Sequence, residues 1–162
     1  MPLWPHQSEC DSFYGNPRGR DGRASPTWEA NNLIKIQAPF QLFYERKPIK
    51  NVMVHKKCAD SLVRVFHSLW ATAGKDQAAV NEWGLSNYAG CYNFRLMRGG
   101  SRLSMHSYAC AIDLDPDRNG LGDSTPRFAD YPWIIDAFEA EGWVWGGKWS
   151  RPDGMHFQAA RV

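Results

Sequence analysis

The chain has 162 residues, 43% of them hydrophobic, and a formal net charge of +2 at pH 7. This length favours a single domain with a substantial core, and no apolar run approaches the roughly 18 residues that cross a membrane. The nearly balanced charge includes no Lys/Arg block, which argues against nucleic acid as the main partner.

The beginning of the chain is rich in Pro, Gly, Asn and charged residues, and we expect residues 1–32 to form an irregular N-terminal arm. Its aromatic residues predict that the arm packs on the body of the protein. The start "MPLWPHQSEC" lacks a basic segment followed by an apolar block, so we expect no signal peptide and synthesis in a cytoplasm. The four cysteines form no C-x-x-C pair, and in that compartment we expect reduced, mostly buried thiols.

The body of the protein, residues 33–162, mixes strands and helices without regular alternation. Alternating apolar residues predict two or three strands within residues 34–54. Apolar residues at helical spacing predict a helix over residues 56–74, which ends at Gly74. We further predict strands at residues 90–97, 109–115 and 155–159, and a helix at residues 130–142. This order indicates an α+β domain with a small mixed or antiparallel sheet and flanking helices.

The segment "SRLSMHSYACAIDLDP" ends a run of small and apolar residues in a carboxylate, Asp113. His106 lies seven residues earlier, and an odd separation places two side chains on opposite faces of a continuous strand. The two residues therefore converge only if His106 lies in the preceding loop. Ala109 and Ala111, at even separations from Asp113, are expected to share its face and to leave space for a pocket.

A second candidate segment, "RPDGMHFQ", places Asp153 three residues before His156 in a Pro/Gly turn. Histidine nitrogen and carboxylate oxygen are ordinary zinc ligands, and three protein ligands with an open position form the catalytic pattern. An unliganded carboxylate beside such a site accepts a proton from the attacking water, and Asp153 is placed for that role. Each residue alone also has a structural interpretation, as a hydrogen-bonded histidine or a turn-capping aspartate.

The two segments together resemble the zinc D-alanyl-D-alanine carboxypeptidases and L-alanyl-D-glutamate endopeptidases. That family carries S-x-H-x-x-G-x-A-x-D and, much later, D-x-x-H-F; here the motifs are "SMHSYACAID" and "DGMHF". The upstream "GCYNFRLMRGGS" is similar to the family's stretch with a substrate-facing arginine, and "WVWGGKW" to the segment before its last ligand. The resemblance covers roughly residues 50–158, and it departs from the family pattern at Ala109, where the family has glycine.

The resemblance implies a hedgehog/DD-peptidase-like fold and one Zn²⁺ per chain. The implied ligands are His106, Asp113 and His156, and the implied general base is Asp153. Arg95 would bind a substrate carboxylate or carbonyl, or stabilise the oxyanion, because a guanidinium matches carboxylate geometry.

Ser104 would hydrogen-bond substrate or a ligand. The implied activity is hydrolysis of an amide bond in the peptidoglycan stem peptide, as in phage endolysins that reach the cell wall after release. Whether the enzyme is an endopeptidase or a carboxypeptidase stays open, and a monomer without stable membrane insertion is expected.

Other candidates have less support. Asp115, Asp117 and Asn119 match the start of a calcium loop, but Pro126 stands at the twelfth position, where a bidentate Glu belongs. His55 and His67 are expected to be structural, and Cys110 to point away from Asp113.

The tryptophans of "WVWGGKW" fit either the core or a substrate-stacking surface. Two functional alternatives also remain: a non-catalytic zinc-containing module that binds the cell wall, and a structural phage component of the same fold.

Overall fold

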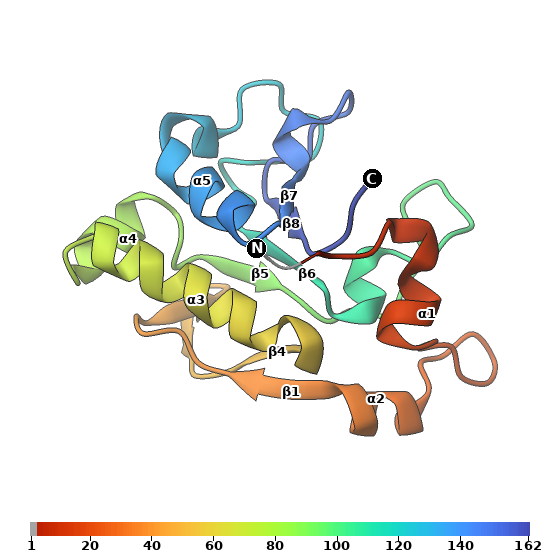
Figure 1. Cartoon of the computed structure of the whole chain (residues 1–162). Coiled ribbons are helices and arrows are strands. Elements are labelled where there is room, and N and C mark those ends of the chain that lie inside the picture. The colour runs from red at the N-terminus through yellow and green to blue at the C-terminus, as the bar shows by residue number, and fades with distance from the viewer. Residues whose placement is uncertain (1–2) are drawn as a thin grey trace.

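The computed structural model describes residues 3–162. Residues 1 and 2, which belong to the predicted N-terminal arm and to the segment expected to lack a signal peptide, lie outside the described residues. The chain folds as an α+β protein with small antiparallel sheets and flanking helices, as the sequence predicts (Figure 1). The elements are η1 (Gln7–Glu9), α1 (Cys10–Tyr14), α2 (Pro26–Asn32), β1 (Leu33–Ile36), β2 (Leu42–Tyr44), β3 (Lys47–Ile49), β4 (Val52–His55), α3 (Lys56–Thr72), α4 (Gln77–Glu82), β5 (Tyr88–Gly90), η2 (Met105–Tyr108), β6 (Ala111–Leu114), η3 (Arg127–Asp130), α5 (Pro132–Ala140), β7 (Val144–Trp145), η4 (Gly146–Lys148) and β8 (His156–Gln158).

The largest sheet in the described chain has four strands in the order β5-β6-β8-β7, and every neighbouring pair is antiparallel. Its two central strands bring distant parts of the sequence together, because Asp113 in β6 lies opposite His156 in β8. Two smaller antiparallel pairs, β1–β4 and β2–β3, precede this sheet along the chain. The sheet therefore supplies a rigid base for the candidate site.

Helix α3 is the main helix that packs between the β1–β4 pair and α5 (Figure 1). Its apolar positions, among them Leu62, Phe66 and Leu69, recur at helical spacing and are fully buried. His55 begins the helix by accepting a hydrogen bond from the Lys57 amide at 3.0 Å. The predicted helix over residues 56–74 is confirmed, with its last turn ending just before the glycine.

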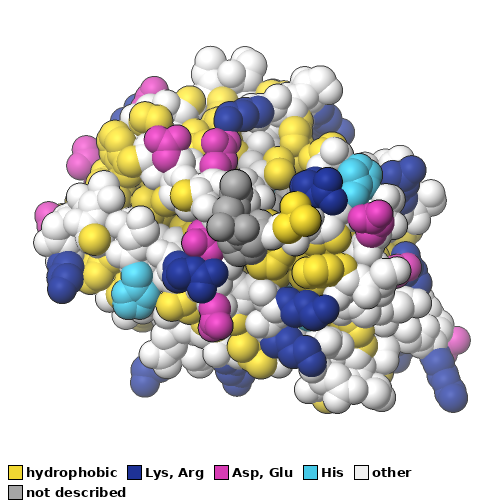
Figure 2. Space-filling view, in the orientation of Figure 1, with side chains coloured by type: hydrophobic (Ala, Val, Ile, Leu, Met, Phe, Trp, Pro, Cys, Tyr) yellow, Lys and Arg dark blue, Asp and Glu magenta, His cyan; other side chains and the backbone are white. Residues whose placement is uncertain are grey.

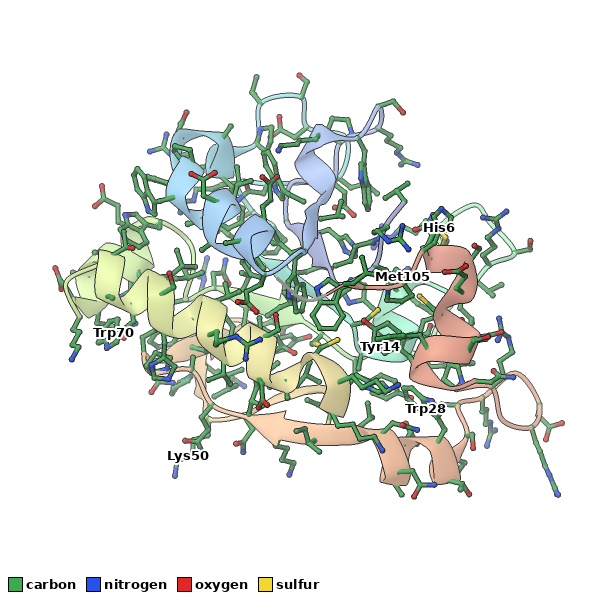
Figure 3. The ribbon with its side chains drawn as sticks, in the orientation of Figure 1. His6, Tyr14, Trp28, Lys50, Trp70 and Met105 are labelled. Atoms are coloured by element: carbon green, nitrogen blue, oxygen red, sulfur yellow. The ribbon has the colours of Figure 1, made fainter. Side chains whose placement is uncertain are left out.

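The N-terminal segment is more regular than expected, since it contains η1, α1 and α2. Ser25 caps α2 by accepting from the Trp28 amide at 3.2 Å, and proline follows at the first helical position. Tyr14 points from α1 into the body, where its hydroxyl donates to the Ala159 carbonyl at 2.6 Å (Figure 3). Trp28 donates in turn to the Tyr14 carbonyl at 3.0 Å. The Tyr14 contact joins the N-terminal segment to the last residues of the chain, and the Trp28 contact joins α2 to α1.

The strand predicted at residues 90–97 is wrong, because the strand there, β5, ends at Gly90. The backbone beyond it is held by a side chain: Ser107 Oγ accepts from the Arg95 amide at 2.9 Å and donates to the Arg95 carbonyl at 2.8 Å. These bonds satisfy the backbone without a strand ladder. Helix α4 was not predicted either; Asp76 caps it at 3.0 Å.

On the face drawn in Figure 2, basic and acidic side chains are interspersed among hydrophobic ones. This distribution agrees with the balanced composition. Across residues 3–162, none of the helices combines the length and apolar character that a bilayer crossing requires.

Candidate metal centre

His106 is presented by a short 3-10 helix, η2, in the loop before β6. Ser104 caps this helix by accepting from the His106 amide at 3.3 Å. Ala109 ends it in the left-handed conformation, with φ +55° and ψ +31°, and its amide donates to the His106 carbonyl. Glycine adopts this conformation without the steric cost of a β-carbon. Ala109, which stands where the motif of the resembled family has glycine, therefore occupies a backbone conformation in which its methyl group carries a steric cost.

Asp113 and His156 come from facing strands. They are register partners in β6 and β8, and the side chain of Asp113 is only 19% exposed. Ala111 shares the Asp113 face of β6, as expected. Ala109 does not, because it lies in the turn before the strand begins at Ala111. The predicted strand 109–115 is thus shorter than expected.

The three side chains form a compact cluster. One ligand atom from each of His106, Asp113 and His156 lies within 4.8 Å of the others. His106 Nε2 is 3.1 Å from Asp113 Oδ2, and His156 Nδ1 is 3.1 Å from Asp113 Oδ1. Ligand atoms bonded to zinc at 2.0–2.1 Å with tetrahedral angles are about 3.3 Å apart. The two histidine–carboxylate separations, each to a different Asp113 oxygen, are close to that spacing.

Hydrogen bonds on the far side of each ring fix which nitrogen is free to bind. His106 Nδ1 lies 2.8 Å from the Cys91 carbonyl, which only accepts, so this nitrogen carries the proton. His156 Nε2 lies 2.9 Å from Gln158 Oε1, and the amide group of Gln158 is oriented by donating to the Ala160 carbonyl at 2.9 Å. Both neutral rings therefore turn a lone pair toward the Asp113 carboxylate.

Two lone pairs that face one carboxylate repel it unless a cation lies between them. The buried His106 Nε2 has no hydrogen-bond partner among the described residues, since its 3.1 Å approach to Asp113 lacks hydrogen-bond geometry. Burial alone would raise the pKa of Asp113, but the two histidines hold that pKa well below its usual range. Burial opposes protonation of His156, yet Asp113 raises the pKa of His156. The cluster has the donor atoms and the electrostatics to hold a cation, either a proton or a metal ion.

Asp153 lines the same cleft as the three residues of the cluster, a cavity of about 360 Å³. It lies just before β8, where its amide donates to the Gly146 carbonyl at 2.8 Å. Gly146 is required there, because a β-carbon on it would lie 2.6 Å from the Asp153 carbonyl oxygen. Burial raises the pKa of Asp153, and the nearby Asp113 raises it further. Within the described chain Asp153 makes no side-chain hydrogen bond, so its carboxylate is available to a ligand in the cleft.

The two other predicted site residues also line this cleft. Arg95 is half-buried, and among the described residues its guanidinium bonds only the neighbouring Leu96 carbonyl, at 3.2 Å. Ser104 is buried, and its hydroxyl caps the helix that carries His106. The structure thus gives Ser104 a positioning contact with the His106 backbone.

Sequence reasoning missed several residues around the cluster. Gln158 orients His156, and its position two residues later on the same strand face was a usable signal. Cys91 acts through its backbone carbonyl, which no sequence pattern reveals. Trp149 packs 5.5 Å from the His156 ring and lines the cleft, whereas Trp143 and Trp145 are buried in the core. The aromatic segment "WVWGGKW" therefore contributes two tryptophans to the core and one to the wall of the cleft.

The remaining candidates are structural in the described chain. Asp115 is buried, and its carboxylate is bound by Arg118 Nε at 2.8 Å and Asn87 Nδ2 at 3.1 Å, which leaves it poorly suited to calcium. His55 is buried and bonds the Tyr14 carbonyl at 2.9 Å. All four cysteines are buried, and the Cys110 thiol donates to the Met105 carbonyl at 3.4 Å.

Fold and site together define an α+β protein with a His–Asp–His cluster, of a kind that can hold a metal ion, in the wall of a cleft. Residues 98–159 match the family model described as D-alanyl-D-alanine carboxypeptidase. That range includes the cluster and Asp153 but not Arg95 or the N-terminal segment. The match supports a peptidase that acts on peptidoglycan. No curated protein and no solved structure matches the chain.

Proposed function

We propose that the protein is a zinc-dependent peptidase that hydrolyses an amide bond in the peptidoglycan stem peptide. The observation that carries the proposal is the pair of histidine lone pairs directed at Asp113, in the cleft that also contains Asp153. The family match over residues 98–159 supports the reaction class. The endolysin type rests on the motif resemblance alone and is part of the proposal.

His106, Asp113 and His156 are the proposed metal ligands. Two neutral imidazoles and one carboxylate are a donor set that zinc favours, and the acceptors at Cys91 and Gln158 hold the imidazoles in the ligating tautomer. Bound zinc would supply Lewis acidity, which acidifies water and polarises the scissile carbonyl.

Asp153 is the proposed general base. Its carboxylate takes a proton from the attacking water and later delivers it to the leaving amine nitrogen. The raised pKa of Asp153 suits both steps, because a more basic carboxylate accepts a proton more readily near neutral pH.

Arg95 is the proposed substrate-binding residue. Its guanidinium lines the cleft and makes no ion pair in the described chain, so it can receive a carboxylate or carbonyl of the stem peptide. Ser104 contributes by holding the backbone of His106 in place.

Three variants test this assignment. His106→Ala and His156→Ala should lose both zinc, measured by metal analysis, and activity on purified peptidoglycan. Asp153→Asn should keep zinc and lose activity by about 10²–10⁴-fold, because it removes the base while preserving shape. Near-normal turnover by Asp153→Asn would show that the base lies elsewhere. Metal-loaded wild type that fails to clear peptidoglycan would favour a non-catalytic wall-binding or structural role.

Digestion of defined muropeptides, followed by mass spectrometry, identifies the bond. Release of free D-alanine assigns a carboxypeptidase. Separation of L-alanine from the rest of the stem assigns an L-alanyl-D-glutamate endopeptidase.

A further inference from the structure

A second cleft, of about 710 Å³, lies between the β2–β3 hairpin, β5 and the turn after β6. Its volume is in the range of small-molecule binding sites. None of the cluster residues lines it. Lys50, which follows β3, marks the position of this hairpin at the edge of the molecule (Figure 3).

Two tyrosine rings form the apolar part of the cleft. Tyr44 is 42% exposed, and its ring lies 6.3 Å from that of Tyr88 at an angle of 54°. Tyr88 is half-buried, so the pair presents one exposed and one partly covered apolar ring, each with a polar hydroxyl at the edge. They suit a ligand with an apolar face and a polar rim.

The polar lining of the cleft offers both donors and acceptors. Glu45 and Asp117 bring negative charge and Arg46 brings positive charge, and in the described part of the chain none of the three side chains is hydrogen-bonded or ion-paired. Asn81 Oδ1 already accepts from Gln77 at 2.9 Å and from Ser86 at 2.7 Å, which leaves its amide hydrogens for a ligand. The mixed charge disfavours a strongly anionic or cationic ligand and favours a neutral one rich in hydroxyl and amide groups.

The hairpin turn carries these side chains at a conformational cost. Glu45 and Arg46 are consecutive residues with φ of +49° and +68°, the conformation in which hairpins favour Asn-Gly. Their side chains make no hydrogen bond among residues 3–162. Strained backbone conformations that no structural contact requires are found most often at binding sites.

We propose that this cleft binds a saccharide chain, with sugar rings on Tyr44 and Tyr88 and hydroxyl or acetamido groups on Glu45, Arg46 and Asn81. The choice of an amino-sugar polymer rests on the proposed function, since the glycan of peptidoglycan carries the stem peptide. The chain runs from Asp113 to Pro116 in three residues, so the cleft begins within about 11 Å of a proposed metal ligand along the backbone. The proposal places one polymer in both clefts, which would hold the glycan while its peptide is cut.

The test is calorimetric titration of the full chain with a peptide-free hexamer of β-1,4-linked N-acetylglucosamine. Saturable binding is expected, and Tyr44→Ala should weaken it at least tenfold. The double variant Glu45→Asn/Arg46→Gly should also weaken binding at least tenfold while its Tm stays equal or rises, because Asn-Gly suits the turn. Lys50→Ala, an exposed charge removed next to the same hairpin, should bind within twofold of wild type.

Absence of binding at millimolar hexamer would overturn the proposal, as would unchanged affinity in both cleft variants. Preferential binding of an unstructured peptide in the same titration would also overturn it. The hexamer carries no stem peptide, so it tests the saccharide cleft alone. If the protein hydrolyses peptidoglycan but does not bind the hexamer, only the saccharide proposal is refuted. Binding without hydrolysis of peptidoglycan refutes only the proposed function.

Discussion

The clearest consequence of the site geometry concerns Gln158, which is not a metal ligand. Its Oε1 lies 2.9 Å from His156 Nε2 and fixes the proton there, so that Nδ1 faces Asp113 with a lone pair. Gln158→Leu has similar volume but offers no acceptor. The His156 ring then loses its preferred tautomer and orientation, and its buried N–H loses its partner.

Loss of such a supporting contact typically weakens metal binding by about 10–100-fold. That factor corresponds to roughly 1.4–2.7 kcal/mol. We expect zinc affinity of Gln158→Leu to fall within this range, measured by competition with a chromophoric chelator at fixed pH. Gln158→Glu retains an acceptor oxygen but loses the amide that donates to the Ala160 carbonyl, so it should bind zinc more tightly than Gln158→Leu and less tightly than wild type.

Two results would refute this reasoning. Gln158→Leu could bind zinc within twofold of wild type while its circular dichroism and unfolding transition are unchanged, which would show that the contact does not orient His156. Alternatively, Gln158→Glu could lose as much affinity as Gln158→Leu, which would show that an acceptor oxygen at this position does not by itself support His156.

Three further predictions concern stability. Burial lowers the pKa of His55 to about 4 from 6.5, so between these pH values the unfolded chain binds more protons than the folded chain. The free energy of unfolding should therefore fall by at most about 3 kcal/mol as the pH drops from 6.5 to 4. Urea unfolding across this pH range checks the expectation, and His55→Gln should lack this contribution. Tyr14→Phe should cost about 1–3 kcal/mol in urea unfolding, because the buried Ala159 carbonyl loses its donor, whereas Tyr44→Phe on the surface should be neutral. Zinc at 100 times its Kd should raise Tm by roughly 5–10 °C, reversed by a chelator, and an equal rise in His156→Ala would contradict the assigned ligands.

Elements with strong local signals were predictable from sequence. Apolar spacing before a glycine predicted the long helix α3, and Pro132 near the start of a periodic segment predicted α5. The strand predicted over residues 90–97 is absent because Ser107, 12 residues after Arg95, holds the Arg95 backbone in a loop. The short helices of the N-terminal segment were missed because packing through Tyr14 stabilises them more than local propensity does.

The sequence by itself selected the residues of the candidate site: residue types and spacing singled out His106, Asp113, Asp153 and His156, and strand parity required His106 to come from a loop. Only the tertiary structure decided which nitrogen of His106 faces Asp113, because that choice depends on the Cys91 carbonyl, 15 residues earlier in the chain. For His156 the orienting residue, Gln158, lies on the same strand and was within reach of sequence reasoning. Tertiary structure also showed that Ala109, which stands where the motif of the resembled family has glycine, adopts a left-handed backbone conformation. The second cleft has no sequence signature, because its lining residues come from four separate segments that meet only after folding.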